Sequence, residues 1–217
     1  MHYTKLKKDE FLDKTKRLIR RSKDEKMREA FLAYGYNDQR LSEGEEMYSK
    51  LSRISDDHVM KARMKVYWFS IKQEQLVKAR KMYMKYLKIA RITFDDNEDA
   101  KKSLLLEGPR ARTYKEWFYQ ASLFCRNITR HEEFLEPFSR YGVQVTHIAA
   151  LRAELDKLSE LSDKCVKISG ELKKLTREKK EMTITFQHWI SDYIKIARIA
   201  LENDPAILEG LGVSVRY

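Results

Sequence analysis

Apolar residues recur every three or four positions along much of this 217-residue chain. Such spacing places them on one face of an α-helix. The longest series predicts one helix over about residues 144–177, with a sustained heptad-like seam typical of helices that pack as coiled coils. Its members are Ile148, Leu151, Leu155, Leu158, Leu161, Cys165, Ile168, Leu172 and Leu175. We expect them to form a core together with Phe186, Ile190, Tyr193, Ile194 and Ala197.

Glycine and proline predict where several other helices begin and end. An amphipathic helix is expected over residues 9–33, ending at Gly35, where a left-handed glycine would close it. The same Tyr-Gly-apolar sequence returns around Gly142. Short helices are predicted within residues 96–108 and 204–210, and Pro137 is expected to break the helix that precedes Gly142.

The segment from Lys179 to Thr185 is polar and then β-branched, and it aligns with residues 72–78. Helices longer than about 25 residues are uncommon in globular domains. We therefore expect a break at both places, although neither glycine nor proline marks a turn there. An uninterrupted helix is the alternative.

The chain also resembles itself at a fixed offset. Residues 86–92 read YLKIARI and residues 193–199 read YIKIARI, and 193 minus 86 is 107. We predict a tandem duplication of a helical unit of about 107 residues, with repeats at 1–107 and 108–217, packed together as one elongated all-α bundle. The apolar positions of the first repeat should then meet the core positions of the second. They are Tyr48, Leu51, Ile54, Val59, Ala62, Val66, Phe69, Leu76, Ala79, Tyr83, Leu87, Ala90 and Phe94.

Composition agrees with long helices. The chain has only 7 Gly and 3 Pro, with 35% charged and 42% hydrophobic residues, which is too hydrophobic for a disordered chain. No uncharged apolar run approaches the ~20 residues of a spanning helix, and the first residues lack a signal-peptide pattern. We expect a cytoplasmic protein without membrane insertion, whose two cysteines, Cys125 and Cys165, are buried thiols.

Residue patterns that carry chemistry are missing from the sequence. None of the five histidines follows an acidic residue at the spacing of a helical metal site, and no glycine-rich phosphate loop occurs. The serines repeated at 52/159 and 55/162 lie within helical patterns, with no glycine-rich elbow before them. We therefore predict no catalytic residue, no metal, no cofactor and no enzymatic activity.

Positive charge is the feature that could specify a partner class. The net charge is +11, and between Lys61 and Arg91 ten Lys and Arg accompany a single acid, Glu74. Four lysines there share one helix face, and phosphate groups could bind along it. The candidate polyanion-binding residues are Lys78, Lys81, Lys85, Lys88, Arg91, Arg17, Arg20 and Arg21. A solvated charged face explains the same pattern, and the aligned positions of the second repeat keep only Lys195.

Residues 196–205, which read IARIALENDP, continue to Gly212 in a tail that resembles the C-terminal ends of uncharacterised bacterial all-helical proteins of similar length. The resemblance covers about twenty residues. It implies a bacterial cytoplasmic protein and carries over no functional residue.

Together these patterns favour a non-enzymatic helical scaffold or adaptor, which binds another protein or forms a homo-oligomer. The alternative is a nucleic-acid-binding protein that uses the basic surfaces of residues 14–28 and 61–91. A bundle that binds a ligand between its helices is a third possibility.

Overall fold

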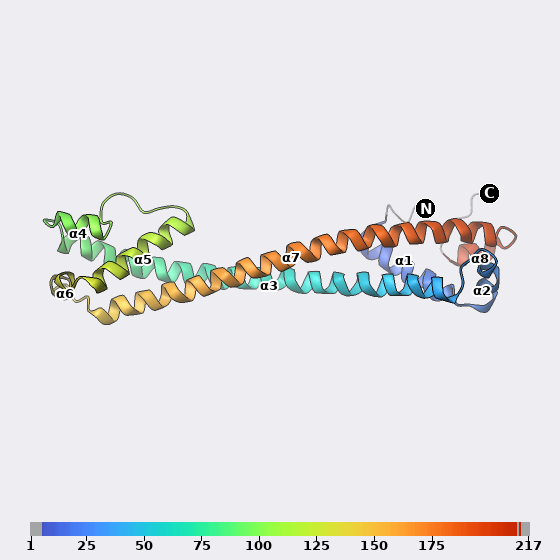
Figure 1. Ribbon diagram of the computed structural model, residues 1–217, viewed down its shortest axis with the longest axis horizontal. Coiled ribbons are helices and arrows are strands. Elements are labelled where there is room, and N and C mark those ends of the chain that lie inside the picture. Colours follow the sequence, from blue (N-terminus) through green and yellow to red (C-terminus); the bar gives the residue numbers. More distant parts are fainter. Residues whose placement is uncertain (1–5, 212, 214–217) are drawn as a thin grey trace. The chain divides into compact units, whose positions relative to one another are not determined.

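The computed structural model describes residues 6–211 and 213, and within them every regular element is a helix. Figure 1 labels them α1 to α8. Their bounds are α1 Lys8–Arg21, α2 Glu25–Leu32, α3 Asp38–Thr93, α4 Glu98–Ser103, α5 Tyr114–Arg130, α6 Glu132–Ser139, α7 Val145–Ala200 and α8 Pro205–Gly210. The predicted all-α fold class is confirmed.

Two Tyr-Gly turns end α2 and α6 as the sequence predicts. Gly35 and Gly142 both have positive φ angles, 80° and 75°. The following amides donate back across the turn, Tyr36 N to Phe31 O at 3.2 Å and Val143 N to Phe138 O at 3.3 Å. This six-to-one hydrogen bond, with an apolar residue after the glycine, is the Schellman motif.

The helix bounds themselves recur at a spacing of 107. Adding 107 to the bounds of α2, α3 and α4 gives the bounds of α6, α7 and α8. The first helices differ more, since α5 begins at Tyr114 and α1 at Lys8.

The predicted breaks at residues 72–78 and 179–185 are wrong, because α3 and α7 each continue through them for 56 residues. The threonines that suggested a break are accommodated by hydrogen bonds to the preceding turn. Thr183 Oγ1 donates to Lys179 O at 2.6 Å and Thr185 Oγ1 donates to Glu181 O at 3.1 Å. A threonine hydroxyl that bonds to the carbonyl four residues earlier is compatible with a continuous helix, at a slight cost in stability.

The predicted single helix over residues 9–33 is also wrong. It divides into α1 and α2 at residues 22–24, and the equivalent division between α5 and α6 falls at His131. Pro137 therefore does not cause the break, since it lies inside α6. Ser22 ends α1 with its hydroxyl 2.8 Å from Leu18 O and 2.5 Å from the hydroxyl of Tyr193.

The chain forms two compact units, and each combines parts of both predicted repeats. Unit 1 comprises Met1–Ala62 and Gly170–Tyr217, and unit 2 comprises Arg63–Ser169. Unit 1 therefore holds α1, α2, α8, the start of α3 and the end of α7. Unit 2 holds the end of α3, α4, α5, α6 and the start of α7.

An aromatic cluster forms the core of unit 1. The rings of Trp189 and Tyr193 stack with centroids 5.5 Å apart, and Tyr36 meets Tyr193 edge-on at 5.3 Å. Such arrangements suit the quadrupoles of the rings. The predicted core residues of this part of α7 are all buried, namely Phe186, Ile190, Tyr193, Ile194 and Ala197.

The heptad-like seam of α7 is confirmed in part. Six of its residues are buried, namely Ile148, Leu151, Leu155, Leu158, Cys165 and Ile168. Leu161, Leu172 and Leu175 are only half-buried.

Candidate interaction surfaces

The predicted apolar face of the first repeat enters a core in part. Leu51 clusters with Phe186 and Ile190 in unit 1, and Leu76 and Leu87 cluster with Leu151 and Leu155 in unit 2, but the positions within residues 59–69 do not. Val59, Val66 and Phe69 are exposed and Ala62 is half-buried. The expectation that these residues meet the core positions of the second repeat is therefore wrong.

Unit 2 consequently presents an unpartnered apolar surface on α3, which we call the aromatic segment and define as Met64, Val66, Tyr67 and Phe69. Val66 is 72% exposed, Tyr67 58% and Phe69 44%. Consecutive residues point 100° apart around a helix, so these side chains cover several sides of α3. Trp68, within the same stretch, is half-buried, and Nζ of Lys164 on α7 lies over its ring, 5.2 Å from the centroid. A helix that is apolar on most of its circumference is normally buried.

The lysine stripe, Lys78, Lys81, Lys85 and Lys88, lies on the exposed side of α3 in unit 2. The opposite side of the same helix turns is buried in the core through Ala79, Tyr83 and Leu87. The structure therefore places all four predicted lysines on one surface, as their spacing indicates.

Lys78 differs from the other three lysines because it has an intramolecular partner. Its Nζ lies 2.9 Å from Oε2 of Glu154 on α7. Gln75 Nε2 donates to the same oxygen at 2.7 Å, and Lys157 Nζ lies 3.3 Å from Oε1. Hydrogen bonds from Gln75 and from Lys78 lower the pKa of the Glu154 carboxyl to about 2. Lys78 thus helps to hold a buried carboxylate.

Arg91 also has hydrogen-bond partners within its own unit. Its Nε donates to Leu106 O at 2.6 Å and its Nη2 donates to Gly108 O at 2.9 Å. These bonds fix the chain after α4, so Arg91 acts as a structural clamp. The other predicted arginines, Arg17, Arg20 and Arg21, are exposed on α1 in unit 1. The predicted polyanion-binding residues therefore divide into arginines on a surface of unit 1 and lysines on a surface of unit 2.

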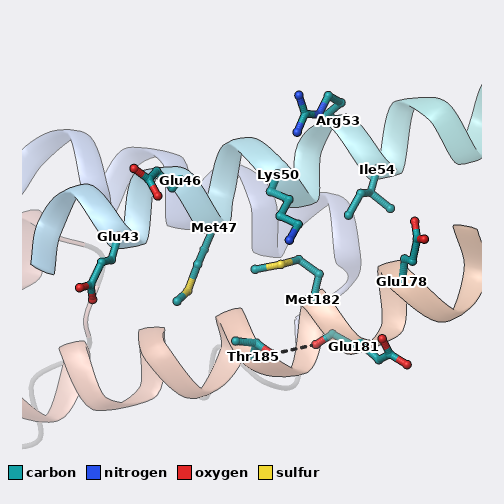
Figure 2. Close-up of a pocket in the computed structure, with 10 residues that line it drawn as sticks. All are labelled: Glu43, Glu46, Met47, Lys50, Arg53, Ile54, Glu178, Glu181, Met182 and Thr185. Atoms are coloured by element: carbon teal, nitrogen blue, oxygen red, sulfur yellow. Dashed lines mark hydrogen bonds between the residues drawn. The ribbon is translucent and has the colours of Figure 1, made fainter.

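A groove that sequence analysis did not find lies in unit 1 between α3 and α7. Its volume is about 820 Å³. Met47 and Lys50 of α3 and Met182 of α7 point into the gap between the helices (Figure 2). We call it the Met47–Met182 groove. Its remaining lining residues are Glu43, Glu46, Arg53, Ile54, Glu178, Glu181 and Thr185.

This groove occupies the position that the Glu154 network occupies in unit 2. At the 107-residue offset, Met47 corresponds to Glu154 and Met182 to Gln75. Thr185 corresponds to Lys78, while the lysine at position 50 is retained as Lys157. The polar network that fills the space in unit 2 is thus replaced in unit 1 by two thioethers with glutamates around them. Aligning the repeats position by position would have shown this difference.

Three further features of the described residues concern metal binding, thiol reactivity and membrane crossing. No group of three or more His, Cys, Asp or Glu side chains lies where it could hold a metal ion within the part that the structure describes. Cys125 and Cys165 are buried free thiols, and burial raises the pKa of Cys125 to about 12, which keeps it protonated and unreactive. None of the described helices is long and apolar enough to cross a membrane.

No protein-family model, curated protein or solved structure matches this chain. Its function therefore has to be inferred from the surfaces themselves.

Proposed function

We propose that this protein is a non-enzymatic helical scaffold or adaptor that binds another protein or itself. The observation that carries the proposal is the aromatic segment, in which four large apolar side chains are exposed within six residues of α3. Exposed apolar residues gathered in this way mark interaction sites.

The composition of the aromatic segment suits a protein partner. Aromatic residues and methionine are enriched at the centres of protein interfaces. Fully burying one large apolar side chain contributes about 1.5–3 kcal/mol, so covering Val66, Tyr67 and Phe69 would provide a substantial part of a binding free energy. A hydrophobic groove on a partner is the usual complement to a helix that presents apolar residues.

Affinity capture from the native cells tests this function. The baits are the wild-type chain and the variant Val66→Ser/Tyr67→Ser/Phe69→Ser. A control variant, Tyr119→Ser/Tyr141→Ser/Val145→Ser, changes two tyrosines and a valine that are at least half exposed elsewhere in unit 2. We expect the wild type and the control to retain a protein partner or a second copy that the first variant loses. Recovery of no specific protein and no self-association by the wild type would contradict the proposal.

Nucleic-acid binding is the second candidate, because the lysine stripe is exposed on one side of α3. Each phosphate contact made by a lysine weakens binding as salt rises. The test is a fluorescence titration with DNA and RNA at low and high salt. Lys81→Glu/Lys85→Glu/Lys88→Glu should abolish binding, and it spares Lys78, whose loss would disturb Glu154. Absence of micromolar binding at low salt would exclude this candidate.

We also propose that the chain arose by tandem duplication of a unit of about 107 residues. Three features support the duplication: the repeated heptapeptide, the equal spacing of three pairs of helices and the paired Schellman turns. A cytoplasmic location, supported by two unpaired buried cysteines, belongs to the same proposal, since disulfides are rare in reducing compartments.

A further inference from the structure

Several acidic side chains around the Met47–Met182 groove form no ion pair with the described residues of their own chain. Among the described residues, no ion pair joins Glu43, Glu46 or Glu181 to a cation. Glu178 has a long contact of 3.7 Å with Lys174. The groove thus carries four glutamates against two cations, Lys50 and Arg53, and favours a basic occupant.

The interior of the groove suits aliphatic chains. Met47 and Met182 reach into it from opposite helices (Figure 2). Methionine is flexible and polarizable, and it adapts to irregular partners. A lysine side chain can lay its methylene groups against such a surface while its ammonium group reaches an acidic rim.

The lysine stripe presents the matching chemistry. Lys81, Lys85 and Lys88 are exposed, and within the described chain no ion pair engages them. At a rise of about 1.5 Å per residue, they are spread over roughly 10 Å of one side of α3. Glutamates stand on both sides of the groove, three residues apart on α3 and three residues apart on α7. A single helix lying along the groove would bring each lysine near a carboxylate.

We propose that the Met47–Met182 groove binds the lysine stripe of a second copy of this chain. The inference rests on the proposed function, because it names one partner for the scaffold. A nucleic acid would account for the unpaired lysines but not for the unpaired glutamates, which would repel it. The contact is heterologous, since the groove of one copy receives the stripe of the next, and such contacts build rings or open chains.

Sedimentation velocity over a range of protein concentrations, at low and high salt, tests the proposal with charge-reversal variants. The groove variant is Glu43→Lys/Glu46→Lys/Glu181→Lys, and the stripe variant is Lys81→Glu/Lys85→Glu/Lys88→Glu. The control variant, Lys167→Glu/Lys173→Glu/Lys180→Glu, makes the same charge change as the stripe variant at exposed lysines of α7. Circular dichroism confirms that each variant keeps its helices, as expected for exposed positions.

We expect the wild type to associate with increasing concentration and to dissociate at high salt, as charge attraction requires. Either reversal should weaken association by at least about tenfold, because opposite charges become like charges. A chain that carries both sets of reversals should associate again, while the control variant should differ little from the wild type.

Monomeric wild-type protein at every concentration would overturn the inference, and so would association that the groove variant leaves unchanged. Loss of association in both variants without recovery in the combined chain would also contradict it. If instead Val66→Ser/Tyr67→Ser/Phe69→Ser is the variant that abolishes self-association, the groove is wrong as the docking site and the scaffold function stands. A stripe variant that loses only DNA or RNA binding would favour the nucleic-acid candidate.

Discussion

Gly44 lies against the indole of Trp189 in unit 1. Because the glycine has no side chain, the large ring fits beside it. A Cβ atom at position 44 would overlap the Trp189 ring, which is held by stacking on Tyr193 and by edge contact with Tyr36. At the offset of 107, the corresponding residues are Leu151 and Met82. Leu151 is buried in the core cluster of unit 2, and Met82 packs against that cluster. Two side chains of similar size in unit 2 thus replace the glycine and tryptophan of unit 1.

Gly44→Ala should destabilise the protein by about 1–3 kcal/mol, because the packed ring cannot move away from the added methyl group. Gly170→Ala is the matched control. Its Cβ would meet no atom within 4 Å, and alanine in a helix interior is favoured over glycine by about 0.5–1 kcal/mol. Urea unfolding of the two variants measures both changes. Equal effects of the same sign would contradict the packing described for Trp189.

Glu154 makes the stability of unit 2 sensitive to acid. Its pKa is lowered from 4.5 to about 2 in the folded chain, so the unfolded chain binds its proton first as pH falls. The stabilisation by the ionised carboxylate is therefore complete above about pH 4.5 and lost as pH falls towards 2. Its size is at most about 3 kcal/mol, less where solvent screens the exposed lysines.

Glu154→Gln should remove this contribution at neutral pH and flatten the dependence on pH. Urea unfolding at pH 7 and at pH 3 provides the measurement. The wild type should lose more stability between the two pH values than the variant loses. The same loss in both proteins would mean that the carboxylate is not held as the hydrogen bonds indicate.

At the scale of elements, the continuity of α7 is the point at which sequence and structure differ most clearly. The seam predicts where the helix begins, and the Tyr-Gly turn predicts where α6 ends. Neither pattern reveals that Thr183 and Thr185 bond to the preceding turn. Helix propensity near residue 180 is weak, and the continuous helix is stabilised there by the tertiary packing of Phe186 and Ile190.

Ile184→Pro tests that continuity, because Ile184 is exposed within the segment where a break was expected. Proline inside a helix removes a hydrogen bond and clashes with the preceding turn, at a cost of about 3 kcal/mol or more. Ile184→Ala, the control, should be neutral or slightly stabilising, since alanine has the higher helix propensity. Thermal unfolding followed by circular dichroism distinguishes them. Full tolerance of proline would indicate a turn rather than a continuous helix.

The surfaces were predicted less completely than the helices, for physical reasons. The spacing of Lys81, Lys85 and Lys88 places them on one face without further information. The burial of Glu154 and the clamp made by Arg91 depend on contacts between segments far apart in the sequence. The exposure of Val66 and Phe69 could not be read from periodicity, because an apolar stripe looks the same whether or not a helix covers it.

At the scale of the whole molecule, both units are built from the same two long helices, and each carries a different surface. Unit 1 contains the acidic Met47–Met182 groove, while unit 2 contains the aromatic segment and the lysine stripe. A chain with distinct surfaces on its two units can hold more than one partner. Protein binding through the aromatic segment is the central claim.

Site-specific photocrosslinking tests that claim most directly. A photoreactive phenylalanine analogue replaces Tyr67 in one chain and Gln73, an exposed polar position of the same helix, in another. After irradiation in the native cells, we predict a discrete protein adduct from position 67 and a much weaker one from position 73. Equal labelling from both positions, or no protein adduct from position 67, would contradict the claim.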